Sequence, residues 1–174
     1  MINIDERLIK KLKAGDKAAQ EVCYISLSPT IYTTLVKICR DREIANDLLH
    51  DTFIQLFDTA ITLDSNINLI AWVKKIAINK AFNYIKRSKL SVLEFQPRLD
   101  DYLTEGRNDS DMLDRLLASL PAEQRVVVWL FIVEGYSHAK IGHFVQKSES
   151  YSKSVLSRCL NKFRCQIGDV NESY

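Results

Sequence analysis

Apolar residues recur at intervals of three and four positions through most of the chain, which is the spacing of an amphipathic helix. In the first half the pattern predicts a helix over residues 4–14, a second helical stretch that ends at about residue 41, and helices over residues 43–57 and 69–89. Gly15 is placed to end the first of these, and Pro29 predicts a break or a new helix start near Ser28.

The pattern lapses over residues 91–111 and then returns. This stretch contains Pro97 and Gly106 and more acids than bases, so we interpret it as a linker between domains. The alternative is a long surface loop inside one domain. Beyond it the spacing predicts helices over residues 112–120, 122–134, 137–145 and 151–166. The last two of these, joined by a polar turn, form a helix-turn-helix pattern.

Composition supports a helical reading. Of the 174 residues only 5 are Gly and 3 are Pro, while 47% are hydrophobic, which argues against a turn-rich β-sandwich, a collagen-like chain or a disordered chain. We therefore expect an all-α fold with two small helical domains joined by a flexible linker. The expected parts are residues 1–90, 91–111 and 112–174.

Neither a membrane nor a metal is expected. No apolar run approaches the roughly 18 residues of a membrane span, and the charged start lacks a signal-peptide core, so we expect a cytoplasmic protein without membrane insertion. No CxxC pair and no His at zinc-ligand spacing accompanies the cysteines, so we expect reduced thiols and no metal or cofactor. The cysteines are Cys23, Cys39, Cys159 and Cys165.

The formal net charge of +2 conceals an uneven distribution. Residues 41–64 are acidic, whereas residues 71–90 and 135–164 are basic. Separate basic, helical segments are typical of a protein that contacts nucleic acid at two places. The acidic segment would be repelled by phosphate, so we expect it to face a protein.

Helical-wheel arithmetic divides the first basic helix into two faces. The polar face carries Trp72, Lys75, Asn79, Lys80, Asn83, Lys86 and Arg87. Lys and Arg bind phosphates, Asn can read base edges, and Trp offers a stacking plane for an unpaired base. The alternative, equally compatible with the spacing, places Trp72 in the core and leaves the lysines as a solvated face.

The last helix divides in the same way. Its expected buried stripe is Val155, Leu156, Cys159, Leu160 and Phe163, and its expected outer face is Tyr151, Lys153, Ser154, Ser157, Arg158, Asn161, Lys162 and Arg164. A basic, polar face on the second helix of such a motif suits the major groove of DNA. An ordinary amphipathic surface helix is the alternative.

These segments together resemble a known family. Residues 45–57 (ANDLLHDTFIQLF) are similar to the conserved second-region helix of bacterial sigma factors, and residues 71–79 (AWVKKIAIN), followed by Asn83, resemble their promoter-melting helix. Residues 116–121 (LLASLP), Arg125 and residues 134–137 (EGYS) resemble the start of the fourth region. Length and order match the extracytoplasmic-function (ECF, group IV) sigma factors of the sigma-70 superfamily.

The resemblance implies roles. The expected partners are core RNA polymerase, through its β′ clamp helices and β flap, promoter DNA, and an anti-sigma factor or other regulatory protein. The residues expected on or supporting the polymerase-docking helix are Asp47, Leu48, Asp51, Thr52, Phe53 and Gln55. Those expected at the −10 element are Asn66, Asn68, Trp72, Lys75, Asn79, Asn83, Lys86 and Arg87. Those expected at the −35 element are Tyr151, Lys153, Ser154, Ser157, Arg158 and Lys162.

The chain departs from the family pattern at several positions. The family usually has Asp at position 83, an acid at 140, Gly at 146 and a β-branched apolar residue at 152, where this chain has Asn83, Lys140, Gln146 and Ser152. On the helical wheel, position 152 lies on the buried stripe of the last helix. A positive φ at position 146 would be more costly for Gln than for Gly. The departures bear on the −35 preference more than on the fold.

Two other function classes remain to be weighed. A stand-alone helix-turn-helix regulator would need neither the acidic helix nor the helix that carries Trp72. A small enzyme would need a phosphate-binding glycine loop or a nucleophile beside a base, and the sequence shows neither. His50, His138 and His143 are isolated, so we expect no catalytic role for them.

Overall fold

The computed structural model describes residues 6–64, 66–91 and 109–171, and every regular element in these ranges is a helix, which confirms the all-α fold. The chain divides into two compact units, Met1–Asn83 and Tyr84–Tyr174. Most of the predicted linker, residues 92–108, lies outside the described residues, so the predicted domain boundaries stay a prediction.

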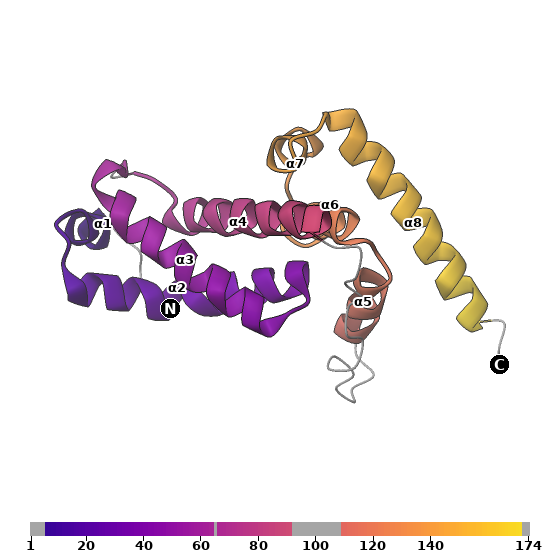
Figure 1. Ribbon diagram of the computed structural model, residues 1–174, viewed down its shortest axis with the longest axis horizontal. Helices are drawn as coiled ribbons and strands as arrows, with labels where there is room; N and C mark the ends of the chain where they lie inside the picture. Colours follow the sequence, from indigo (N-terminus) through magenta and orange to yellow (C-terminus); the bar gives the residue numbers. More distant parts are fainter. Residues whose placement is uncertain (1–5, 65, 92–108, 172–174) are drawn as a thin grey trace. The chain divides into compact units, whose positions relative to one another are not determined.

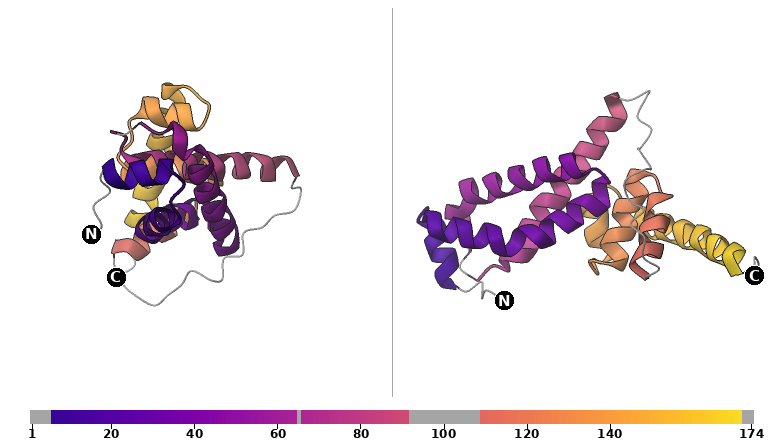
Figure 2. Two further views of the ribbon diagram at one scale, coloured as in Figure 1. Left: turned by 90° about the vertical axis from the view of Figure 1, so that its left-hand side faces the viewer. Right: turned by 90° about the horizontal axis from the view of Figure 1, so that it is seen from below.

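The first unit is a helical bundle, shown in Figures 1 and 2. Polar side chains cap its helices, because Asp16 Oδ1 accepts from the N–H of Ala19 at 2.8 Å and Asp41 Oδ1 accepts from Ile44 at 3.0 Å. Its elements are α1 (Glu6–Lys13), α2 (Lys17–Cys39), α3 (Arg42–Thr59), the 3₁₀ turn η1 (Ala60–Thr62) and the first part of α4 (Leu69–Ser91).

The helices of the first unit bury their apolar faces against one another. Side chains from α2, α3 and α4 are almost completely enclosed, and they form the core that fixes the outward faces of α3 and α4. The largest are Ile31, Leu35, Ile38, Leu56, Leu69, Val73 and Ile78.

The break predicted at Pro29 is wrong, because α2 runs through it without interruption. Proline lacks the N–H that would bond to the carbonyl of Ile25 one turn earlier. Both residues lie on the exposed side of α2, where water can satisfy that carbonyl. The apolar residues on the other side, including Leu27 and Ile31, keep their places in the core.

By length and composition alone α2 is apolar enough to cross a membrane, which is weak evidence for a span. Its buried residues, among them Cys23, Leu27 and Leu35, belong to the core of the bundle. A core helix of this length satisfies the same criteria as a membrane span, and 33% of the apolar window of α2 is buried.

The second unit contains α5 (Asp109–Ala118), α6 (Ala122–Ile132), α7 (His138–Phe144) and α8 (Glu149–Asn171). The buried Arg125 side chain links the end of α5 to α6: Nε donates to the carbonyl of Leu117 at 3.1 Å and an NH₂ group donates to that of Leu120 at 3.0 Å. These bonds satisfy carbonyls that the end of α5 leaves without helical partners. Helices α7 and α8 form the predicted helix-turn-helix.

One position in α8 differs from the predicted stripe, because Leu160 is exposed. Ser152 is completely buried beside Val155, Leu156, Cys159 and Phe163, as its place on the stripe predicts. The buried stripe therefore begins at a hydroxyl. The helix also begins at Glu149 rather than Tyr151, because Ser148 Oγ accepts from the N–H of Tyr151 at 3.1 Å and caps it.

Candidate nucleic-acid and protein interfaces

The outer face of α3 is acidic and exposed. Its acids recur about one helical turn apart and therefore lie along one side of the helix. They are Glu43, Asp47, Asp51 and Asp58. We call them, together with Ile54, the α3 face.

Ile54 lies among these carboxylates with 58% of its surface exposed. An isolated exposed apolar side chain needs no explanation, but one set between acids at helical spacing suits a protein partner. Sequence reasoning missed it. The sequence did contain a signal for it, because Ile54 lies off the helical stripe that holds Leu49, Phe53 and Leu56, which α3 buries.

The residues predicted for polymerase docking divide into two groups. Asp47, Asp51 and Gln55 are exposed. Leu48, Thr52 and Phe53 are buried. The Thr52 hydroxyl donates to the Leu48 carbonyl at 2.6 Å, and the Phe53 ring lies 4.7 Å from that of Tyr24 in α2. The buried three hold α3 in its unit and cannot touch a partner.

The loop before α4 is ordered by its own polar groups. The N–H of Asn66 donates to Asp64 Oδ1 at 3.0 Å, and the N–H of Ala71 donates to Asn68 Oδ1 at 3.0 Å. Asn68 therefore uses its side-chain oxygen to cap α4, and its NH₂ group can still donate to a ligand. Asn66 is exposed, and its backbone position is fixed by the turn.

Helix α4 presents the expected polar face. Lys75, Asn83, Lys86 and Arg87 are exposed, whereas Asn79 and Lys80 are half-buried. The opposite side is buried and includes Val73, Ile76, Ala77, Ala81 and Ile85.

Trp72 is half-buried, so it is neither enclosed in the core nor fully solvated. An indole in this position can lean on the bundle and still offer a face to a ligand. Tyr84, the next residue of α4 after Asn83, is exposed. An aromatic side chain there adjoins Asn83 and adds to the surface available for contact.

The predicted −35 residues lie on the outer side of α8. Lys153, Ser154, Ser157, Arg158 and Lys162 are exposed, and Tyr151 is half-buried. Burial raises the pKa of the Tyr151 phenol, so this group stays a neutral hydrogen-bond donor.

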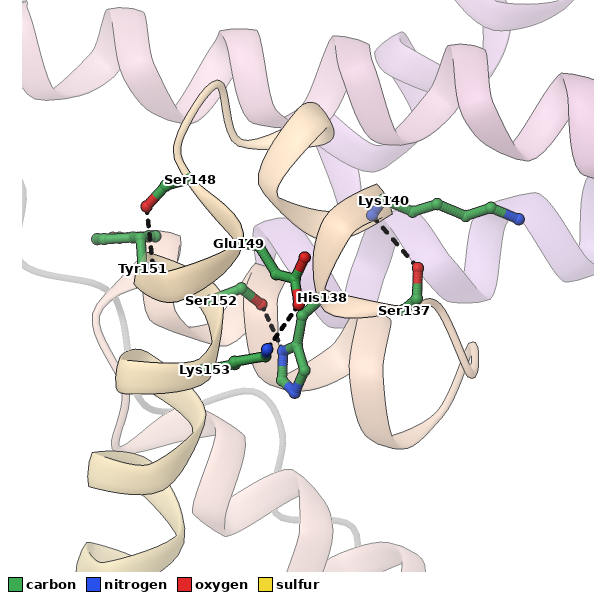
Figure 3. A network of polar contacts seen from close by, with 8 residues as sticks. All are labelled: Ser137, His138, Lys140, Ser148, Glu149, Tyr151, Ser152 and Lys153. Atoms are coloured by element: carbon green, nitrogen blue, oxygen red, sulfur yellow. Dashed lines mark hydrogen bonds and ion pairs between the residues drawn. The ribbon is translucent and has the colours of Figure 1, made fainter.

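Three of the cations on α8 already have partners. Arg158 Nε donates to the carbonyl of Ser154, one turn earlier, at 3.3 Å. Lys153 Nζ lies 2.6 Å from Glu149 Oε1, one turn earlier, and this hydrogen bond lowers the pKa of the Glu149 carboxyl (Figure 3). Lys162 Nζ donates at 2.8 Å to the carbonyl of Ser119 at the end of α5. Lys162 therefore stabilises the unit from the middle of α8, away from the start of the helix, where the groove contacts of such motifs are made.

The turn between α7 and α8 is tight. Gln146 adopts φ 52°, as expected for the position where the family usually has Gly. Gly142 in α7 lies against the turn, because a Cβ atom added there would approach the carbonyl O of Lys147 to 2.8 Å. The close approach of α7 to the turn therefore depends on Gly142, while the unusual backbone conformation is carried by Gln146.

The chain is similar to known proteins over most of its length. Residues 23–90 match the family model of sigma-70 region 2. The ECF RNA polymerase sigma factor SigF of Caulobacter vibrioides is 31% identical over 118 residues, covering 66% of this chain and 65% of the relative. SigM of Bacillus subtilis, an ECF RNA polymerase sigma factor, is 21% identical over 141 residues, covering 77% of this chain and 86% of the relative.

Solved structures share the fold. The sigma factor RpoE of Bartonella quintana, solved with the anti-sigma factor NepR, has a TM-score of 0.66 at 19% identity and covers 85% of this chain and 96% of its own. CnrH, solved with the cytosolic domain of CnrY, has a TM-score of 0.60 at 16% identity and covers 96% of this chain and 99% of its own. From the region 2 match and these relatives we conclude that the chain belongs to the sigma-70 family, as an ECF RNA polymerase sigma factor.

Proposed function

We propose that this sigma factor binds core RNA polymerase through the α3 face, recognises the −10 element with α4 and its preceding loop, and recognises the −35 element with the start of α8. One observation carries the assignment. The exposed face of α3 is acidic, whereas the outer faces of α4 and α8 are basic. Phosphate repels the acidic face of α3 and attracts the basic faces of α4 and α8. We therefore assign the α3 face to a protein partner and the faces of α4 and α8 to DNA.

The α4 surface suits the opening of the −10 element. A base that leaves the duplex costs a few kcal/mol of unstacking, which a pocket and an aromatic plane can offset. Asn66 lies in the loop before α4, and Trp72 lies in the first turns of the helix. Lys75, Lys86 and Arg87 would bind the phosphates of the opened strands and set the register without reading sequence.

The α8 surface suits duplex DNA. Tyr151, Lys153 and Ser154 lie in the first turns of the second helix of the motif, where base edges are read in the major groove. Ser157 and Arg158 follow one turn later and would reach bases or phosphates. Because part of the affinity would come from displaced counterions, it should fall as salt rises.

Further partners follow from the family. The Bartonella quintana relative is held by an anti-sigma factor, and we propose that a regulatory protein likewise controls this chain by covering the α3 face or the DNA-binding faces. The proposed location is the cytoplasm, where polymerase and promoter are found. We propose no catalytic role, since all of the proposed work is binding and positioning.

The polymerase assignment is tested by reversing a charge on the α3 face. Asp51→Arg should lower the affinity for core polymerase at least about tenfold, because it replaces an attraction at the contact with a repulsion. Glu21→Arg makes the same change in charge at an exposed site on α2 and should leave the affinity unchanged. Affinity is measured by fluorescence anisotropy of the labelled sigma factor. Equal affinities for the two variants would overturn the assignment and favour a regulator that acts without polymerase.

A further inference from the structure

His138 joins three helices of the second unit. It is the first residue of α7, its Nδ1 lies 3.0 Å from the Ser152 hydroxyl in α8, and its ring stacks on Phe131 of α6 at a centroid distance of 4.4 Å and an angle of 18°. Figure 3 shows the imidazole directed at Ser152 from across the junction of the two helices.

Ser152 is the only residue of the described part of α8 that is both polar and completely buried. A buried hydroxyl without a partner costs free energy, so the bond to His138 compensates for a serine in an apolar stripe. The two residues are therefore complementary: His138 supplies the polar atom that Ser152 needs, and Ser152 fixes the orientation of the ring. Sequence reasoning placed Ser152 on the buried stripe as a departure from the family pattern, but it treated His138 as isolated and missed the bond between the two.

Ser152 lies between Tyr151 and Lys153, which face outward from the same turn of α8. A restraint on Ser152 therefore restrains the backbone that carries both. A one-ångström displacement is enough to spoil a bidentate contact with a base edge, since hydrogen bonds weaken steeply with distance and angle.

We propose that His138 is a positioning residue for −35 recognition: its hydrogen bond to Ser152, supported by the stack on Phe131, sets the first turn of α8 in the orientation that the major groove requires. The inference rests on the proposed function of α8. His138 touches no DNA in this role and acts through Ser152.

Three variants separate the two contacts of His138. His138→Phe keeps an aromatic ring against Phe131 and leaves the Ser152 hydroxyl without its partner. His138→Asn removes the ring and keeps a polar δ atom for Ser152. The double variant His138→Phe with Ser152→Ala removes the hydroxyl together with the need for a partner. His143→Phe, at an exposed site on the same helix, is the matched control.

The measurement is the ratio of holoenzyme affinities for a promoter with an intact −35 element and for one with that element scrambled, accompanied by thermal unfolding of each variant. His138→Phe should reduce the ratio about tenfold, which corresponds to one lost hydrogen bond left unsatisfied. His138→Asn should recover most of it, and His143→Phe should leave it unchanged. The double variant should recover the unfolding temperature but not the ratio, because it has no buried unsatisfied hydroxyl and also no bond that positions the turn. A double variant that recovers both would reduce His138 to a purely structural role and overturn the proposal.

The outcomes also separate this inference from the proposed function. If the unaltered holoenzyme does not distinguish the two promoters, α8 is not the −35 reader and both fail. If it does distinguish them and His138→Phe retains the full ratio, only the inference fails. Should His138→Phe not fold, the comparison of His138→Asn with His138→Ala decides the same question, and equal ratios would overturn the proposal.

Discussion

Lys13 Nζ donates a 2.9 Å hydrogen bond to the carbonyl oxygen of Leu63, 50 positions further along the chain. The bond ties the last residue of α1 to the residue that follows η1 and caps it. The loop that carries Asn66 begins immediately afterwards. A charged donor thus fixes one end of this loop, and the Asn68 cap of α4 fixes the other.

Lys13→Met keeps the apolar part of the side chain and loses the charged donor. We expect this variant to discriminate less well between bases of the −10 element. A charge-assisted hydrogen bond contributes roughly 1.5–3 kcal/mol, so the free energy of unfolding should fall by about that amount or less. Urea unfolding measures the stability, and open-complex formation on promoters with single −10 substitutions measures the discrimination. Lys10→Met, at an exposed site on α1, is the control. Identical base preferences in the two variants would contradict a role for this bond in ordering the loop.

The exposed Ile54 should contribute to polymerase binding out of proportion to its size. Apolar side chains surrounded by charge often carry much of an interface's energy, so Ile54→Gln should lower the affinity for core polymerase about tenfold. Because the side chain is 58% exposed, the unfolding temperature should hardly change. Ile61→Gln, at a residue 70% exposed on η1, is the matched control. Binding is followed by anisotropy, and an unaltered affinity for Ile54→Gln would remove this residue from the interface.

Trp72 should matter for promoter opening more than for duplex binding. Trp72→Ala removes the plane on which an unpaired base could stack, and a loss of about 1–3 kcal/mol per stacked base is expected. The decisive readout is permanganate reactivity of −10 thymines, compared with closed-complex affinity under the same conditions. Trp72→Phe should restore most of the reactivity. Normal reactivity of Trp72→Ala would assign the indole to packing alone.

The sequence predicts a residue's environment correctly where that environment depends only on the residue's own helix. Periodicity located the helices and the polar face of α4, because burial there follows the sequence pattern. It failed at Pro29, where the exposed side of α2 tolerates the lost hydrogen bond. It placed Ser152 correctly on the buried stripe but could not identify the hydrogen-bond partner of its hydroxyl, because that partner comes from another helix.

The same limit applies to the predicted interface residues. The spacing of residues 45–57 placed Leu48, Thr52 and Phe53 in a family motif, but a motif does not distinguish a residue that touches a partner from one that supports the helix. Their burial makes that distinction. Likewise, the bond from Lys162 to Ser119 joins α8 to the end of α5, a long-range contact that no local pattern contains.

Glu149 should restrain DNA binding by its neighbour. Its carboxylate lies 2.6 Å from Lys153 Nζ and places a negative charge at the end of α8 that would enter the groove. Glu149→Gln frees Lys153 for phosphate, so non-specific DNA affinity should rise and the salt dependence should steepen by about one released counterion. Titrations of DNA binding at several salt concentrations test this. Glu21→Gln, at an exposed acid of α2, serves as the comparison, and equal slopes in the two variants would contradict the prediction.

Gln146 holds a backbone conformation that costs a non-glycine residue about 1–2 kcal/mol. Gln146→Gly should remove that cost. Part of the gain is offset because glycine has greater freedom in the unfolded chain, so we expect a net stabilisation of roughly 0.5–1 kcal/mol. Lys147→Gly should instead be destabilising. Lys147 does not have a positive φ, so glycine relieves no strain there and only adds freedom to the unfolded chain.

Gly142→Ala provides the opposite test of the same turn. The added methyl group would meet the backbone of Lys147 at 2.8 Å and that of Ser148 at 3.0 Å, and backbone atoms cannot move aside as a flexible side chain can. We expect a loss of roughly 1–3 kcal/mol from overpacking, together with weaker −35 recognition, because α7 and α8 would be forced apart. Thermal unfolding of Gln146→Gly, Gly142→Ala and the unaltered protein orders the three. If Gly142→Ala proves as stable as the unaltered protein, α7 does not pack as closely on the turn as the structure indicates.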